Sequence, residues 1–188
     1  MRGFGRIARV AGTTVYVHWT VVVIAAIALL VDLKNAASTL FLVASYLGVL
    51  VLHEWGHARK ARGKGYGVWS IELYPLHGVT RYDAPRSHYD ACVIAWGGVL
   101  AQLAVAVPLV LGSAVFGFTA VGVVNAIIAI FGYLSLLWVA LNLIPVARLD
   151  GALAWQILPY LWRRRRWLRS GPKRPEGGKR MSKGGWVH

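Results

Sequence analysis

The sequence has one cysteine, few acidic residues and a long stretch, from Ala91 to Ala147, without any charged side chain. A single cysteine excludes an intrachain disulfide and a cysteine-rich zinc site. Cys92 opens an apolar segment, which favours a small buried hydrophobic residue over a nucleophile. The chain has 7 acidic residues against 21 Lys and Arg, so its formal net charge is +14. This imbalance favours a partner or surface of negative charge.

Apolar residues dominate what is present. They make up 57% of the 188 residues, and the mean hydropathy is +0.53. Soluble domains are usually less apolar, and a membrane-spanning helix needs about 20 apolar residues. The sequence therefore predicts an all-α polytopic membrane protein with about four transmembrane helices, at residues 15–31, 36–58, 91–111 and 120–144. Pro108 is expected to kink the third span or end its regular part.

The distribution of positive charge predicts the orientation of these spans. Basic residues gather before the first span, after the second and after the fourth, which places all three segments on the cytoplasmic side. Both termini are then cytoplasmic in a multi-pass protein of the cell membrane. The apolar run at 15–31 is longer than the core of a signal peptide, which favours a retained helix over a cleaved leader.

Two domains are expected: a membrane core at residues 1–162 and a basic tail at 163–188. The tail is rich in Pro, Gly and Lys, a composition typical of disorder. Its charge favours anionic lipids over nucleic acid as a partner. Residues 152–162 are too short to cross a bilayer and are interpreted as an interfacial amphipathic segment.

The loop after the second span is more than a connector. Residues 65–82 contain β-branched and aromatic residues bounded by Gly and Pro, which predicts a short strand or β hairpin at the membrane surface. Residues 9–20 are also expected to begin as an extended segment before the first helix.

The sequence HEWGH, at the end of the second span, is the candidate catalytic motif. His53 and His57 are four residues apart on one helix face, so both can bind a single Zn²⁺, with Glu54 beside the first ligand. Glu54 can then take a proton from a zinc-bound water and later protonate the leaving amine. The alternative is an interfacial helix end, in which the histidines extend to the surface and Glu54 pairs with Arg59 or Arg62.

A catalytic zinc site usually has three protein ligands and an open position. Four residues outside the motif could supply the third ligand: His18, His77, His88 and Asp150. Asp150 is favoured because it falls at the cytoplasmic end of the fourth span, at the expected depth. The alternative for Asp150 is a helix N-cap with Arg148 as its partner.

Together, HEWGH and NLIPVARLDG (residues 142–151) resemble the paired motifs of the site-2 protease family of intramembrane zinc metalloproteases. The segments VYVHWT and YPLHGVT are also similar to parts of that family, and the resemblance covers about residues 10–158. It implies zinc binding by His53, His57 and Asp150, with Glu54 as the general base.

The resemblance also implies substrate-binding residues. Asn142 would lie beside the active site and contact substrate or the oxyanion, although an interhelical hydrogen bond is an alternative role for it. Gly78 and Val79 belong to a strand expected to pair with an unwound substrate segment. Gln102 stands where family members often carry Asn in a G-P-x-x-N segment, and Val99 replaces the Pro.

The expected protein is thus a minimal family member without PDZ or CBS domains, binding one Zn²⁺ per chain and cleaving transmembrane segments of membrane proteins. The alternative is a non-catalytic protein that binds membrane helices as an assembly or regulatory factor. The sequence predicts no oligomeric state.

Overall fold

A computed structural model describes residues 3–147 and 149–163 of the chain. The chain begins with strands β1 (Phe4–Val10) and β2 (Thr13–His18), followed by helices α1 (Trp19–Val31), η1 (Leu33–Asn35) and α2 (Ala36–Gly63). Strands β3 (Val68–Leu73) and β4 (Gly78–Tyr82) come next. Then follow α3 (His88–Phe116), α4 (Gly122–Ile127), the π-helix η2 (Ile128–Leu134), α5 (Ser135–Asn142), α6 (Asp150–Ala154) and η3 (Trp155–Ile157).

The four strands form one sheet in the order β1-β2-β3-β4. The two hairpins are antiparallel and join through parallel pairing of β2 with β3. The sequence predicted the second hairpin and an extended segment before the first helix, where β2 lies. It did not predict β1, whose residues are mostly exposed and show no alternation of buried and exposed positions. The fold is therefore mostly helical with a four-stranded sheet, rather than all-α with one short hairpin.

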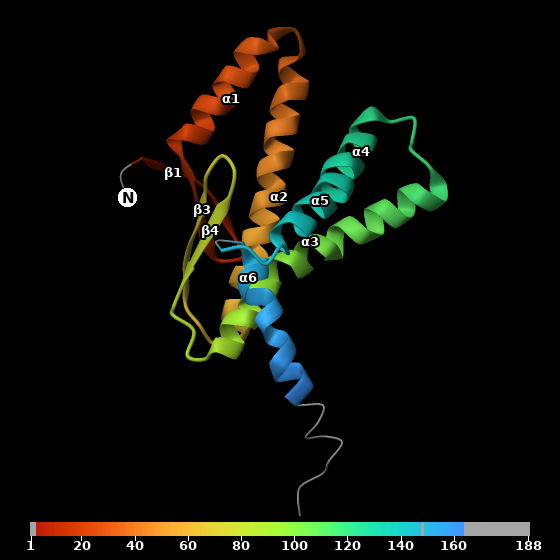
Figure 1. Cartoon of the computed structure of the whole chain (residues 1–188). Coiled ribbons are helices and arrows are strands. Elements are labelled where there is room, and N and C mark those ends of the chain that lie inside the picture. The colour runs from red at the N-terminus through yellow and green to blue at the C-terminus, as the bar shows by residue number, and fades with distance from the viewer. Residues whose placement is uncertain (1–2, 148, 164–188) are drawn as a thin grey trace, which may run out of the picture. The chain divides into compact units, whose positions relative to one another are not determined.

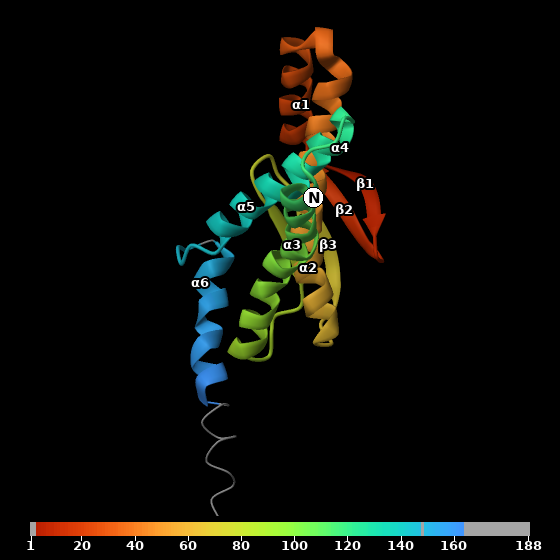
Figure 2. The same cartoon turned by 90° about the vertical axis from the view of Figure 1, so that its right-hand side faces the viewer.

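The sheet packs against α2 through an apolar core. Val15 and Val17 of β2 and Ile71 and Leu73 of β3 are buried together with Leu50 and Ala58 of α2. Figures 1 and 2 show the sheet on one side of α2 and helices α3 to α5 on the other. This arrangement places the lower half of α2 between a sheet and a helical layer, which is where HEWGH lies.

Three helical segments in the described residues are long and apolar enough to cross a membrane: Leu33–Gly63, His88–Phe116 and Gly122–Asn142. Their positions agree with the second, third and fourth expected spans. The first expected span is divided, because its initial residues belong to β2 and α1 has only 13 residues. At 1.5 Å per residue such a helix covers about 20 Å, less than the roughly 30 Å hydrocarbon layer. The count of four spans therefore stays a prediction.

Helix α3 continues through Pro108 to Phe116, beyond the expected end of the third span. Its N-terminus is capped by Ser87, whose side chain accepts a hydrogen bond from the Asp90 N–H over 3.1 Å. The first compact unit of the chain ends at Ile157, and residues 158 to 163 are helical within the second. Most of the predicted basic tail lies outside the described residues, so the domain boundary at 162 stays a prediction.

Candidate metal and catalytic site

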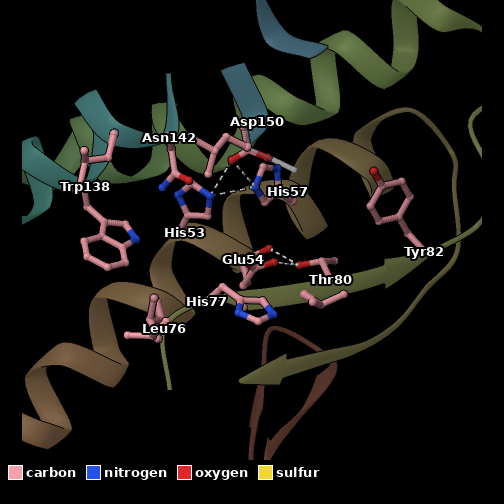
Figure 3. Close-up of a pocket in the computed structure, with 15 residues that line it drawn as sticks. His53, Glu54, His57, Leu76, His77, Thr80, Tyr82, Trp138, Asn142 and Asp150 are labelled. Atoms are coloured by element: carbon pink, nitrogen blue, oxygen red, sulfur yellow. Dashed lines mark hydrogen bonds and ion pairs between the residues drawn. The ribbon is translucent and has the colours of Figure 1, made fainter. Parts of the chain in front are cut away.

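The two histidines of HEWGH lie on one face of α2 and face the first residue of α6. His53 Nε2 and His57 Nε2 are 3.0 Å apart. Asp150 Oδ2 lies 2.8 Å from His53 Nε2 and 3.2 Å from His57 Nε2. Among the described residues, these three form the group whose His, Cys, Asp or Glu donor atoms are close enough to hold one metal ion. The structure therefore brings together the three ligands that the sequence favoured (Figure 3).

The Nδ1 atoms of both imidazole rings contact oxygen acceptors on α3. His57 Nδ1 lies 2.8 Å from the main-chain oxygen of Ile94, and His53 Nδ1 lies 2.8 Å from Gln102 Oε1. A carbonyl oxygen can only accept, so each Nδ1 carries the proton and donates it. In the neutral rings both Nε2 atoms are then unprotonated and directed at Asp150.

This donor set fits a zinc ion. Two imidazole lone pairs and a carboxylate oxygen converge at close range, and a cation would satisfy all three at once. Imidazole nitrogen and carboxylate oxygen are common zinc ligands, and metal-binding histidines characteristically donate their second N–H to a carbonyl or carboxylate. His53, His57 and Asp150 would hold the ion.

Close helix packing makes this geometry possible. A Cβ added at Gly98 of α3 would lie 2.6 Å from both His53 Nε2 and His57 Nε2. At the residue before His57, a Cβ added at Gly56 would clash with the carbonyl oxygen of Gly97. The helices α2 and α3 thus cross at a pair of glycines, as small residues allow in membrane helices.

Asp150 is held in place by the turn between α5 and α6. It is the first residue of α6, and the N-cap is Leu149, so Asp150 does not act as the N-cap. Gly151 lies against the main chain of Leu143, where an added Cβ would come within 2.4 Å of the carbonyl. Trp155 Nε1 donates to the same Leu143 carbonyl over 2.7 Å. Arg148, the partner considered from the sequence, lies outside the described residues.

Glu54 is directed toward the sheet. Thr80 Oγ1 of β4 donates toward Glu54 Oε2 over 2.8 Å and toward the Glu54 main-chain oxygen over 2.9 Å. Glu54 is 6% exposed, and the two motif histidines are similarly buried. The alternative of an interfacial helix end therefore does not hold. Nor does Glu54 pair with either arginine considered from the sequence, because Arg59 lies over the Trp55 ring and Arg62 binds the β1–β2 turn.

A cavity of about 730 Å³ opens over these residues. Its floor is α2, one wall is β4 and the preceding turn, and the other is the end of α5 with Asp150. Gly78, Val79 and Asn142, predicted from the resemblance to contact substrate, all line it. Trp138 and Leu141 of α5 and Leu76 before β4 make much of the remaining wall apolar.

Gln102 lies elsewhere than expected. It is fully buried and is not part of the cavity lining; instead it supports His53. Gln102 Nε2 has no hydrogen-bond partner among the described residues. This is expected, because the proton on His53 Nδ1 requires the amide oxygen of Gln102, and not its nitrogen, to face the ring. The structure thus points to a role in orienting His53 rather than contacting substrate.

The other three histidines considered as ligands do not join the donor cluster of the described residues. His18 Nδ1 contacts Thr20 Oγ1 at 2.7 Å, and His88 Nε2 contacts Gln156 Oε1 at 2.8 Å. His77 is exposed, lines the cavity and stacks on Tyr74 with ring centroids 4.8 Å apart. Sequence reasoning missed Thr80, Gly98 and the Ile94 carbonyl. The glycine pair in an apolar segment was the available signal for α3; a main-chain oxygen leaves no signal.

Tyr82 is a further cavity residue that the sequence did not single out. Its ring packs beside Ala61, Tyr66 and Ile94. Burial raises the pKa of its phenol, and the negative charges of Asp150 and Glu54 raise that pKa further. The hydroxyl therefore stays protonated and can donate a hydrogen bond into the cavity.

The fold and the donor cluster define a class: a helical membrane protein with a candidate zinc centre of the HExxH type. No protein-family profile matches the chain. Two curated proteins are similar to it in sequence. Both are described as "Putative zinc metalloprotease Rip3", from the Erdman and H37Rv strains of Mycobacterium tuberculosis. Each is 31% identical over 190 residues, covering 87% of this chain and 45% of the relative. The chain thus spans less than half the length of these relatives.

Among solved structures, the chain resembles the site-2 protease from Methanocaldococcus jannaschii, with a TM-score of 0.60 and 24% identity. The match covers 89% of this chain and 76% of the other, and at this identity it shows the fold. Together with the curated relatives, it supports the resemblance to the site-2 protease family that the paired motifs carry.

Proposed function

We propose that the protein is a zinc-dependent intramembrane endopeptidase that cleaves transmembrane segments of membrane proteins. The observation that carries the proposal is the convergence of His53 Nε2, His57 Nε2 and Asp150 Oδ2 on one point at the floor of a cavity. Glu54, a carboxylate suited to proton transfer, lines the same cavity. Bound zinc would supply a Lewis acid and lower the pKa of water to near 7.

The residues of the chain would divide the remaining work. Glu54 would receive a proton at its carboxylate and return it to the leaving amine nitrogen. Asn142 makes no side-chain hydrogen bond to a described residue, so its amide is free to bind a substrate carbonyl or the oxyanion. His53, Glu54 and His57 are buried, and low exposure strengthens electrostatic interactions at the floor of the cavity.

Strand β4 would bind the substrate. It is the last strand of the sheet, and its outer edge has no strand partner in the described part of the chain. Leu76 to Thr80 line the cavity, so an extended peptide added to this edge would lie across the site. A helical substrate hides its carbonyls, and we therefore expect cleaved segments to carry small or flexible residues that unwind easily.

The proposed topology has both termini in the cytoplasm, with the metal near the cytoplasmic face. The basic residues that support this topology include a tail that would contact anionic lipids. Cleavage would then release the cytosolic part of the substrate, as in regulated intramembrane proteolysis.

The test compares cells carrying wild-type protein with cells carrying Glu54→Gln. Proteomics of membrane fractions should show single-pass proteins that accumulate with the variant, while the purified variant keeps about one zinc per chain. Asp150→Ala should lose the zinc. If wild type and Glu54→Gln leave the same membrane proteome, the non-catalytic alternative, a protein that binds membrane helices without cutting them, would replace the proposal.

A further inference from the structure

The link between Thr80 and Glu54 joins the edge strand to the proposed general base. The Thr80 hydroxyl has one proton, and it points at two acceptors of the same residue, the carboxylate and the main-chain carbonyl of Glu54. Hydrogen bonds to an ionised acceptor are among the stronger ones in proteins. Glutamate has three rotatable side-chain bonds, so a single fixed donor decides much of where its carboxylate lies.

The register of β4 fixes the direction of this hydroxyl. Thr80 pairs with Ile71 and Gly78 pairs with Leu73, and both partners face the core against α2. Thr80 and Gly78 therefore face α2 as well. At Gly78 the strand comes so close that an added Cβ would lie 2.3 Å from Glu54 Cγ and 2.6 Å from Oε1.

The two oxygen atoms of the Glu54 carboxylate have different surroundings. Oε2 is bonded to Thr80, whereas Oε1 lies over Gly78 and has no hydrogen-bond partner among the described residues. Figure 3 shows the contacts with Thr80 on the side of Glu54 that faces β4. One oxygen is thus anchored and the other remains available.

We propose that Thr80 is a positioning residue that anchors Glu54 through Oε2, so that Oε1 stays free for proton transfer beside a peptide bound to β4. This inference rests on the proposed function. It assigns to one strand two tasks, pairing with substrate through its main chain and holding the base through a side chain. Thr80 does not itself touch the reacting atoms.

Two variants separate the hydroxyl from the shape of the side chain. Thr80→Val keeps the β-branched shape and removes the donor, whereas Thr80→Ser keeps the donor. The control is Thr14→Val, the same change in β2 of the same sheet. The probe is a quenched fluorescent peptide with a 20-residue Leu/Ala segment and a central Gly-Gly pair, presented in detergent micelles with the full-length protein.

For Thr80→Val we expect kcat to fall about 10–100-fold, up to the scale of a 1 Å misplacement of a catalytic group, with KM changed less than about 2-fold. Thr80→Ser should recover kcat to within about 3-fold of wild type, and Thr14→Val should match wild type. All four proteins should hold one zinc per chain. Wild-type kcat in Thr80→Val, or a loss that Ser does not rescue, overturns the inference, as does loss of zinc in Thr80→Val.

Failure of the proposed function gives a different result: wild type and Glu54→Gln would then cleave the probe equally. In that case thermal unfolding still tests whether Thr80 holds the Glu54 side chain. Thr80→Val should lower the Tm by a few degrees in wild type and by clearly less in a Glu54→Ala background, because the carboxylate acceptor is then already gone. Equal Tm losses in the two backgrounds would show that Thr80 does not hold the Glu54 side chain.

Discussion

The substitution Gly98→Ala tests the metal site without replacing any of the three candidate ligands. The added Cβ would lie 2.6 Å from His53 Nε2, His53 Cε1 and His57 Nε2, which is 0.8 Å short of the 3.4 Å at which ordinary contact begins. Metal–ligand distances tolerate only about 0.2 Å of variation. Both rings would have to move, although each is buried and is held at its Nδ1 atom.

We expect Gly98→Ala to lower zinc affinity about 100-fold or more. Removing a residue that hydrogen-bonds to a metal ligand typically lowers metal affinity roughly 10–100-fold, and Gly98→Ala displaces two candidate ligands directly. Helix propensity works in the opposite direction, because alanine is better than glycine in a helix interior by about 1 kcal/mol. Loss of zinc could not then be blamed on an unstable α3.

The assay is a titration of the purified protein in detergent against a fluorescent zinc chelator, with elemental analysis of the dialysed sample. The matched control is Gly112→Ala, which makes the same change in the same helix where an added Cβ meets nothing within 4 Å. If Gly98→Ala binds zinc as tightly as Gly112→Ala, the two rings do not hold the metal as inferred.

Three further predictions follow from neighbouring contacts. Gln102→Leu removes a ring acceptor and should lower zinc affinity about 10–100-fold in the same titration, whereas unchanged affinity would contradict its orienting role. Gly78→Ala should displace Glu54 and abolish peptide cleavage while zinc content stays at one per chain; an active variant would contradict the close packing of β4. Gly56→Ala should force α2 away from α3 and lower the Tm by several degrees, whereas Gly63→Ala, with open space at its Cβ, should not.

Much of the site could be predicted from the sequence, because its ligands are spaced by helix geometry. His53 and His57 are one turn apart, and charge patterning put Asp150 at a matching depth. The sheet was harder to foresee. Strand β1 is an edge strand with mostly exposed residues, so it carries no alternation of buried and exposed positions, and its pairing depends on β2.

The role of α3 could not be predicted from the motifs, for a physical reason. Ile94, Gly98 and Gln102 recur every four residues and so share one face of α3, which lies against both histidines. Each acts through a different property: a main-chain oxygen, the absence of a side chain and an amide oxygen. No shared residue type marks such a face.

The same face explains why HEWGH alone is a weak signal. Two histidines at i and i+4 point the same way on any helix, but their rings bind a metal only if each Nδ1 has an acceptor and each Nε2 has room. Here both conditions depend on the crossing of α2 and α3 at Gly56 and Gly97, because a wider crossing would withdraw both acceptors together. The metal site is therefore a property of the helix crossing as much as of the motif. A chain with HExxH in an apolar helix but bulky residues at the crossing should bind zinc poorly.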